Sequence, residues 1–310
     1  MKKPLVYFFV FFILGAAVFC SPVWAGGHIA VIQGRSLPPY EEAIQGIRQS
    51  LSQSDPSWNI DVYDLEGHPD DKKGPIVDLI RKSGAKLVLT VGTEAAQAFR
   101  DEFDDLSIVM MMVYDPVGEG LADEQHHYGV YLKVSFDQRF SILKKIVPSL
   151  NTLSLLRRAG TKTSLVEEAK IAAATNGLQL VVIDLESLDK FSQVLKEASS
   201  KSQALVMILD QEVYNNSTAK ELLLFSAREK YPVLALASNY VQAGALMSVS
   251  SDFRDNGATA AKLASRLLKG ETFEEHFVPT EKIRVAWNKR IAGIFGIDAP
   301  KAEGVIDDVY

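Results

Sequence analysis

Short apolar, β-branched runs alternate with stretches of helical periodicity along most of the chain. His28–Ile32 is a mostly apolar run of strand length, and it is followed by Ile44, Ile47 and Leu51 at helical spacing. The predicted strands comprise residues 28–32, 58–65, 86–91, 107–113, 128–132, 152–156, 178–184, 204–209, 232–237 and 245–249. The predicted helices comprise residues 40–51, a segment around 76–80, 93–100, 135–147, 164–175, 188–199, 218–230 and 253–268.

Strands that alternate with helices over about 240 residues predict an α/β fold with parallel sheets and right-handed crossovers. The series starts again near residue 152, which indicates two doubly wound lobes. No low-complexity linker separates the two series. We therefore expect a hinge made of ordinary segments, near residues 130–135 and 248–253.

The N-terminal segment has the three parts of a secretory signal peptide. Lys2 and Lys3 precede the uncharged run Leu5–Cys20, and Val23–Ala25 supplies small residues for a cleavage site. The alternative is an uncleaved membrane anchor, but the run is shorter than the roughly 20 residues of a membrane span. We predict cleavage after Ala25 and a periplasmic mature protein.

Composition narrows the classes of function. The chain has 310 residues, of which 47% are hydrophobic and 23% charged, and this excludes a disordered chain, a coiled coil or a polytopic membrane protein. Its net charge of −6 argues against nucleic-acid binding, which needs a basic stripe. The single cysteine, Cys20, supplies neither a disulfide framework nor a Cys-based metal site. The sequence also lacks a Walker A motif, a Gly-x-Ser-x-Gly elbow and a His-Glu-x-x-His helix, so we predict no catalytic residues, metal or cofactor.

Polar and aromatic residues recur just after the predicted strands. Ligands of open parallel sheets bind beyond the carboxyl ends of the strands, so we take these residues as candidates for a ligand site. They are Gln33, Thr93, Tyr114, Asp115, Asp210, Tyr214, Asn239, Tyr240, Asp252 and Phe253.

Three carboxylates in that set carry our hypothesis for the cleft chemistry. We expect Asp115, Asp210 and Asp252 to lie around one ligand, with at least one of them pairing with a ligand ammonium or hydroxyl. The aromatic candidates would form the walls of the site. The alternative is that the three aspartates only cap helices, because Asp is a favoured N-cap residue.

Several stretches of the chain resemble the ABC-transporter substrate-binding proteins of the tryptophan/tyrosine type. The most specific stretch is Tyr114–Leu121 (Tyr-Asp-Pro-Val-Gly-Glu-Gly-Leu), and Thr90–Ala98 is similar to the preceding strand and helix of that family. Further similar stretches are Ala243–Leu246, Asp252, the helix end Leu267–Glu271, the tail Ile283–Asn288, and Gly296, Ile297 and Pro300. The resemblance extends from about residue 28 to about residue 300.

This resemblance implies the type I fold of periplasmic binding proteins. Two Rossmann-like lobes would be joined by three crossings and would close over a small solute. The first lobe would comprise residues 26–132 and about 253–275, and the second lobe residues 133–252 and about 276–310. The signal peptide would comprise residues 1–25.

The resemblance also implies a function without catalysis. The protein would deliver an amino-acid-like, aromatic or related solute to an ABC permease in the inner membrane, and we expect it to be a monomer. One alternative keeps the fold but makes the protein the ligand-binding input of a membrane sensor kinase. A more remote alternative is an enzyme on a doubly wound scaffold, since fold alone does not decide function.

Two departures from the family pattern bear on the ligand. Glu94 stands where relatives commonly have proline after the residue that matches Thr93, and its charge weakens the case for a ligand carboxylate there. Arg157 and Arg158 stand where relatives often have Tyr-Asn. An arginine at that edge of the cleft offers a partner for a ligand carboxylate or phosphate.

Overall fold

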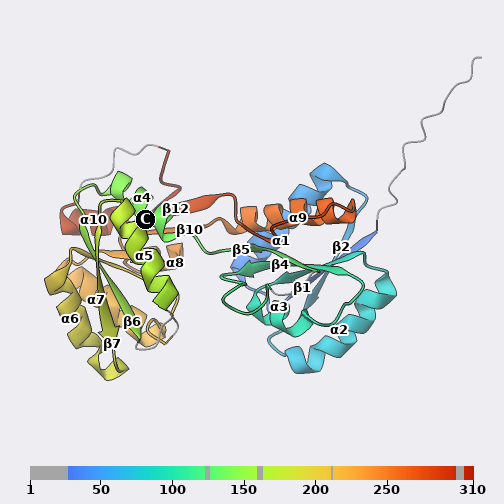
Figure 1. Ribbon diagram of the computed structural model, residues 1–310, viewed down its shortest axis with the longest axis horizontal. Coiled ribbons are helices and arrows are strands. Elements are labelled where there is room, and N and C mark those ends of the chain that lie inside the picture. The colour runs from blue at the N-terminus through green and yellow to red at the C-terminus, as the bar shows by residue number, and fades with distance from the viewer. Residues whose placement is uncertain (1–26, 123–125, 159–162, 211, 298–303) are drawn as a thin grey trace, which may run out of the picture.

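Two mostly parallel sheets form the two lobes of the protein. The computed structural model describes residues 27–122, 126–158, 163–210, 212–297 and 304–310, so the predicted signal peptide lies outside the described residues. Figure 1 shows the two sheets side by side along the long axis of the molecule, each with helices packed on it. The α/β class with two doubly wound lobes is confirmed.

The first lobe is built on a six-stranded sheet in the order β11-β5-β4-β3-β1-β2, and every pair of neighbours in it is parallel. Its strands are β1 (His28–Gln33), β2 (Asn59–Asp64), β3 (Leu87–Val91), β4 (Ser107–Val113), β5 (His127–Tyr131) and β11 (Phe277–Pro279). Its helices are α1 (Pro38–Ser54), α2 (Pro69–Ser83), α3 (Thr93–Phe99) and α9 (Phe253–Leu268).

Both faces of the first sheet are buried. Ile29 and Val31 of β1 pack in a core that includes residues of α1 and α9, whereas Ala30 and Ile32 pack in a core with residues of α2 and α3. Successive strand residues point to opposite faces, so a continuous apolar strand requires helices on both sides. Figure 1 shows α1 and α9 together on one side of this sheet and α2 and α3 on the other.

Two glycines allow α1 and α9 to cross at very short range. A Cβ atom on Gly46 would lie 2.0 Å from the carbonyl oxygen of Arg254, and one on Gly257 would lie 1.8 Å from that of Ala43. Both neighbours are backbone atoms, which cannot turn aside as a flexible side chain can. Helices α1 and α9 therefore each need glycine at their point of contact, and α9 packs closely against α1.

The second lobe is built on a seven-stranded sheet in the order β13-β12-β10-β9-β8-β6-β7. Its strands are β6 (Thr152–Arg158), β7 (Gln179–Leu185), β8 (Ala204–Val206), β9 (Val233–Ala235), β10 (Met247–Ser251), β12 (Ile283–Trp287) and β13 (Asp308–Val309), and β12 is antiparallel to β10. Its helices are α4 (Phe136–Ile146), α5 (Thr163–Thr175), the 3₁₀ turn η1 (Leu188–Lys190), α6 (Phe191–Lys201), α7 (Asn216–Glu229), α8 (Ser238–Gln242) and α10 (Lys289–Phe295).

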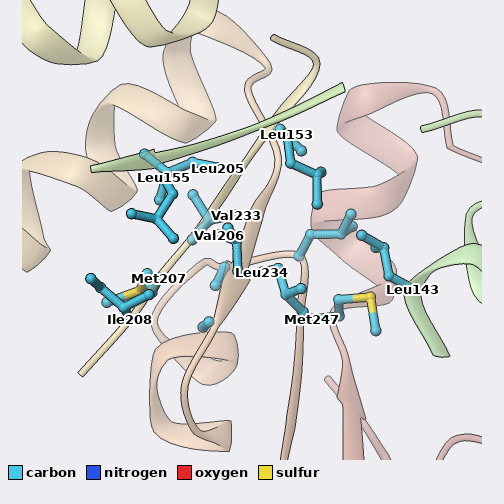
Figure 2. Packing of buried hydrophobic residues seen from close by; sticks show 14 of the residues in the cluster. Leu143, Leu153, Leu155, Leu205, Val206, Met207, Ile208, Val233, Leu234 and Met247 are labelled. Carbon is cyan, nitrogen blue, oxygen red and sulfur yellow. The ribbon is translucent and has the colours of Figure 1, made fainter. Parts of the chain in front are cut away.

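A single large apolar cluster fills the second lobe. Figure 2 shows Leu155 of β6, Val206 of β8 and Leu234 of β9, which lie side by side in register on neighbouring strands, and Leu143 of α4 belongs to the same cluster. These side chains are at most 2% exposed. The cluster fixes the carboxyl ends of β8 and β9 relative to α4. Residues that follow these two strands lie near α4 in the candidate site described below.

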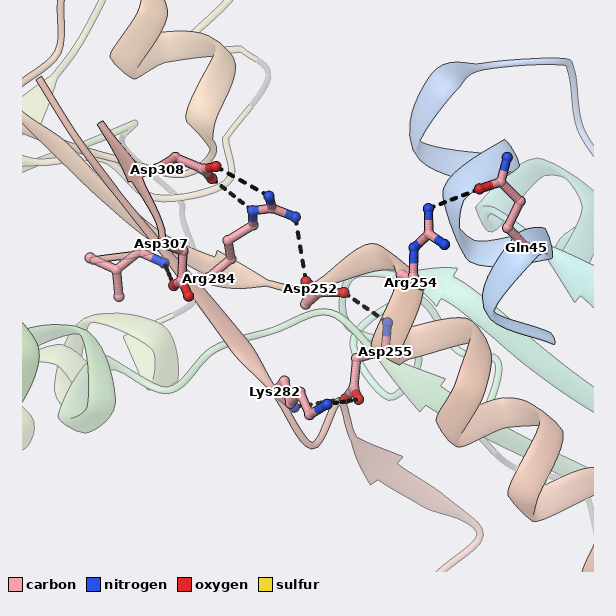
Figure 3. A network of polar contacts seen from close by, with 9 residues as sticks. Gln45, Asp252, Arg254, Asp255, Lys282, Arg284, Asp307 and Asp308 are labelled. Atoms are coloured by element: carbon pink, nitrogen blue, oxygen red, sulfur yellow. Dashed lines mark hydrogen bonds and ion pairs between the residues drawn. The ribbon is translucent and has the colours of Figure 1, made fainter. Parts of the chain in front are cut away.

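The chain passes between the two sheets three times, at residues 132–135, 252 and 280–282. The crossings are bonded to one another: Ser251 Oγ donates to the carbonyl of Leu132 (3.0 Å), and the backbone N–H of Lys282 donates to the carboxylate of Asp255 (2.8 Å). Figure 3 shows Asp252 between Arg284, which it approaches at 3.5 Å, and the first turn of α9. The predicted hinge segments coincide with the first two crossings.

The predicted strands and helices up to α9 correspond to observed ones, but helix α8 was not predicted, and no strand or helix was predicted after α9. We assigned residues from about 276 onward to the second lobe, but Phe277–Pro279 pairs with β5 in the first sheet. The return to the second sheet therefore falls at 280–282, just before β12. Within the described ranges, no helix has the length and apolar character needed to cross a membrane.

Candidate functional site

A cavity of about 260 Å³ lies where the two lobes and their crossings meet. The first lobe contributes Tyr114 and Phe253, and the second lobe contributes residues that follow β8 and β9, together with the end of β10. Its lining is mainly apolar and aromatic, and it contains no carboxylate: Tyr114, Leu132, Val134, Arg139, Leu209, Leu236, Ala237, Asn239, Tyr240, Val249, Ser250, Ser251 and Phe253. A mainly apolar cavity with a few polar groups is the usual form of a small-molecule site.

A bulge at the end of β4 directs the chain toward this cavity. Met112 has φ 57°, a left-handed conformation unusual for a side chain of its size, and the register with β5 shifts at this point. The buried amide of Asn256 supports the bulge, because its Oδ1 accepts from the N–H of Met112 at 3.0 Å. Its Nδ2 donates to the carbonyl of Val130 and to Thr280 Oγ1. Tyr114 follows the bulge and forms part of the cavity wall.

Arg139 of α4 is the one cationic residue in the lining, and it is only 2% exposed. Its Nη2 donates to the carbonyl oxygens of Met207 (2.9 Å) and Ala235 (3.5 Å), at the carboxyl ends of β8 and β9. Its Nε is buried without a hydrogen-bond partner, and no carboxylate in the described part of the chain pairs with it. Phe136, one turn earlier, lies 5.5 Å from the guanidinium.

Burial lowers the pKa of Arg139, because it disfavours the charged guanidinium. Burial has the opposite effect on two neighbouring phenols and raises the pKa of both Tyr114 and Tyr214. The hydroxyl of Tyr214 is also buried with no hydrogen-bond partner among the described residues. The second lobe thus holds a cation and a phenol whose polar groups are incompletely satisfied.

Four of the candidate residues line the cavity: Tyr114, Asn239, Tyr240 and Phe253. Two others lie near it without forming its wall. Tyr214 is a buried residue of the second lobe close to Arg139, and Asp115 directly follows Tyr114.

The three candidate aspartates have local partners. Asp115 Oδ1 accepts from the N–H of Gly118 at 3.0 Å, and Asp210 Oδ1 accepts from the N–H groups of Glu212 and Val213. Asp252 caps α9, because its Oδ1 accepts from the N–H of Asp255 at 2.8 Å. Of the three, only Asp252 makes the helix cap that we gave as the alternative, and Asp115 and Asp210 make turn contacts.

Gln33 ends β1 and Thr93 follows β3, two inner strands of the first sheet, and neither residue lines the cavity. Gln33 is buried and donates to Asp64 at 2.8 Å, and Thr93 begins the short helix α3. Glu94, the departure noted beside Thr93, pairs with Arg35 at 3.0 Å.

The arginines that we considered at the edge of the second lobe do not line the cavity either. Arg157 pairs with Asp184 at 2.6 Å, and Arg158 pairs with Glu212 at 3.1 Å. Arg139 lines the cavity instead, and the sequence analysis did not identify it as a site residue. Its signal was available, because Phe136, Arg139, Phe140 and Leu143 follow helical spacing, which puts an arginine in the apolar stripe of α4.

The fold is the two-lobed architecture of type I periplasmic binding proteins, with a cavity at the junction of the lobes. The profile of the family described as "ABC transporter substrate binding protein" matches residues 28–302. The chain belongs to that family, and the resemblance noted in the sequence is confirmed.

Known proteins agree with this assignment. The chain is 21% identical over 193 residues to a tyrosine-binding protein of Clostridioides difficile (strain R20291), an alignment that covers 60% of this chain and 55% of that protein, so the chain spans about half of its length. The ligand-free, open structure of a substrate binding protein with adhesive properties from Clostridium difficile superposes with a TM-score of 0.77 at 21% identity, covering 91% of this chain and 99% of that one. A domain from Streptococcus pneumonia in complex with L-Trp has a TM-score of 0.65 at 24% identity, covering 92% and 100%.

Proposed function

We propose that the protein binds a small amino-acid-like solute between its lobes and delivers it to the permease of an ABC importer. The observation that carries the proposal is the cavity at the junction of the lobes, which is lined from both lobes by residues at the carboxyl ends of their strands. This is the position at which doubly wound folds bind ligands. We propose Tyr114, Asn239, Tyr240 and Phe253 as ligand contacts.

The relatives support an amino acid as the solute. One is named for binding tyrosine and another was solved with L-Trp. Three aromatic rings in the cavity wall, those of Tyr114, Tyr240 and Phe253, suit an aromatic ligand, because paired aromatic rings contribute about 0.5–1.5 kcal/mol beyond area burial.

We propose that the lobes close on the solute by rotation about the three crossings. The first lobe would comprise residues 26–132 and 253–279, and the second lobe residues 133–252 and 283–310. A hinge needs only a few residues that absorb the change of direction, and the three crossings are short. The hydrogen bonds among them would keep the crossings together while the lobes rotate.

The site of action follows from the same proposal. We propose export by the N-terminal signal peptide, cleavage after Ala25, and a monomer that works in the periplasm. N-terminal sequencing of the protein from a periplasmic fraction should start at Gly26. Recovery of Met1 in a membrane fraction would contradict this part of the proposal.

Mass spectrometry of small molecules released by denaturing the periplasmic protein tests the central claim. We expect an amino acid or a close relative in about equimolar amount, and calorimetry should show that it binds again to the refolded protein. Small-angle scattering of ligand-free protein should show compaction when this ligand is added. Absence of any released or rebinding small molecule would overturn the proposal.

A further inference from the structure

We propose that Arg139 receives the carboxylate of the ligand, so that the site requires a carboxylic acid and does not require an amine. This inference rests on the proposed function and names the chemical class of the solute. It departs from our sequence-based expectation, in which a carboxylate of the protein pairs with a ligand ammonium.

The burial of Arg139 is the first step of the argument. A buried cation is costly unless a counter-charge accompanies it, and guanidinium groups stay protonated in proteins. Arg139 is 2% exposed, and its hydrogen bonds go only to two backbone carbonyls. The anion that would offset its charge is not supplied by the described residues, and the group lies in the wall of a cavity.

The orientation of Arg139 is the second step. One side of the guanidinium is held by the carbonyls of Met207 and Ala235, which fixes its plane at the carboxyl ends of β8 and β9. Only Nη2 donates to these carbonyls, so other N–H groups of the fork are left for a carboxylate. Such charge-assisted contacts are about twice as strong as neutral hydrogen bonds.

The charge of the rest of the lining is the third step. The lining residues include no carboxylate, and Asp115, Asp210 and Asp252 each have local partners. A ligand ammonium would therefore meet only hydroxyls, an amide and aromatic rings. An amine without a carboxylate would bring a second positive charge next to Arg139, which is unfavourable in a site of low dielectric constant.

A ligand series tests the inference on the unaltered protein. The probes are three matched sets: L-tryptophan, indole-3-propionic acid and tryptamine; L-tyrosine, 3-(4-hydroxyphenyl)propionic acid and tyramine; and L-leucine, 4-methylpentanoic acid and isoamylamine. We expect at least one set to bind, with the acid at least about tenfold tighter than the amine. An amine that binds within tenfold of its matched acid, or failure of every acid to bind, overturns the inference.

A variant series tests the role of Arg139 itself. Arg139→Met keeps an unbranched apolar stem and removes the charged guanidinium, and we expect it to weaken acid binding at least about thirtyfold. The matched control is Arg228→Met, because Arg228 also lies over a phenylalanine one turn earlier, at 5.7 Å from Phe225, but is on an exposed face of α7. The control should bind every probe as the parent does.

A purely structural role for Arg139 predicts a different pattern. If Arg139 served only to hold the carbonyls of β8 and β9, Arg139→Met would weaken binding of the acid and of the amino acid. The ratio of the affinity for the acid to the affinity for the amine would then stay as it is in the parent. We expect that preference to fall to less than threefold. An unchanged preference in a folded Arg139→Met protein overturns the inference, and if the variant does not fold, the ligand series on the unaltered protein decides.

The outcomes also separate this inference from the proposed function. A released ligand that lacks a carboxylate would overturn the role of Arg139 and leave solute binding intact. Absence of any bound small molecule would overturn the proposed function as well.

Discussion

The two lobes present different chemistry to the cavity between them. Carboxylates at the edge of the first lobe have partners within that lobe: Glu94 pairs with Arg35, Asp64 accepts from Gln33, and Asp115 accepts from a backbone N–H. The second lobe instead buries a guanidinium for which the described residues supply no carboxylate. On our proposal, the second lobe would recognise the charge of the ligand through Arg139, while the first lobe would contribute the aromatic rings of Tyr114 and Phe253.

Helix α9 supports the cavity wall that the first lobe contributes. This helix crosses α1 through two glycines, and one turn of it carries both Asn256, which supports the bulge before Tyr114, and Gly257. The position of Tyr114 and Phe253 in the cavity wall therefore depends on the contact between α1 and α9. The following predictions are arranged from the largest expected effect to the smallest.

Substitution at the helix crossing should have the largest effect. In Gly257→Val the new side chain would overlap the backbone of Ala43, so we expect a loss of at least about 3 kcal/mol of unfolding free energy, at the upper end for overpacking. Denaturant unfolding measures it. The control Gly293→Ala places a Cβ within helix α10 where no other atom lies within 4 Å, and it should be neutral or slightly stabilising. A Gly257→Val protein within 1 kcal/mol of the parent would refute the account of this crossing.

Asn256→Leu should have the next largest effect and should reach the site. It removes three hydrogen bonds and leaves the N–H of Met112 and the carbonyl of Val130 buried without those partners, a loss of about 2–3 kcal/mol. Because Tyr114 follows the bulge, binding of an aromatic probe should also weaken. Lys262→Leu, on the exposed side of the same helix, should change stability by less than about 1 kcal/mol. Unchanged affinity in a folded Asn256→Leu protein would separate the bulge from the site.

The smallest effects are expected from the three aspartates of the sequence-based hypothesis. Asp115→Ala and Asp210→Ala remove turn contacts and Asp252→Ala removes a helix cap, each at a cost of about 1 kcal/mol of stability. Calorimetric titration should find ligand affinity within about threefold of the parent for all three. A loss of affinity of a hundredfold or more in any of them would assign the ligand ammonium to that carboxylate and weaken the contrast between the lobes.

Local sequence patterns were sufficient to predict most of the fold. Apolar strands such as residues 107–113 and amphipathic helices such as residues 253–268 were predicted with their observed bounds, because periodicity reports burial directly. Helix α8 and the observed elements after α9 were not predicted, among them the short strand Phe277–Pro279. It is only three residues long, and its place in the first sheet depends on a partner far away in the sequence.

The candidate site was predicted less completely. Position after a strand identified Tyr114, Asn239, Tyr240 and Phe253, because topology puts such residues at the crevice. The same rule also selected Asp210 and Asp252, since turn and cap residues occur at the same positions as ligand contacts. Arg139 lies in the middle of a helix, so a rule about strand ends could not find it.

The contact between α1 and α9 also determines when the first lobe can finish folding. Gln45 and Arg254, which are hydrogen-bonded across it, are 209 residues apart in the sequence. Until α9 arrives, the apolar face of α1 with Ile44, Ile47 and Leu51 lacks part of its packing, and the chain between the two helices contains strands β2 to β5 and most of the second lobe. Contacts of such long range slow folding, because the chain entropy of closing the loop must be lost before the contact forms. The first lobe, although it begins the chain, should therefore be completed only after the second lobe has largely formed.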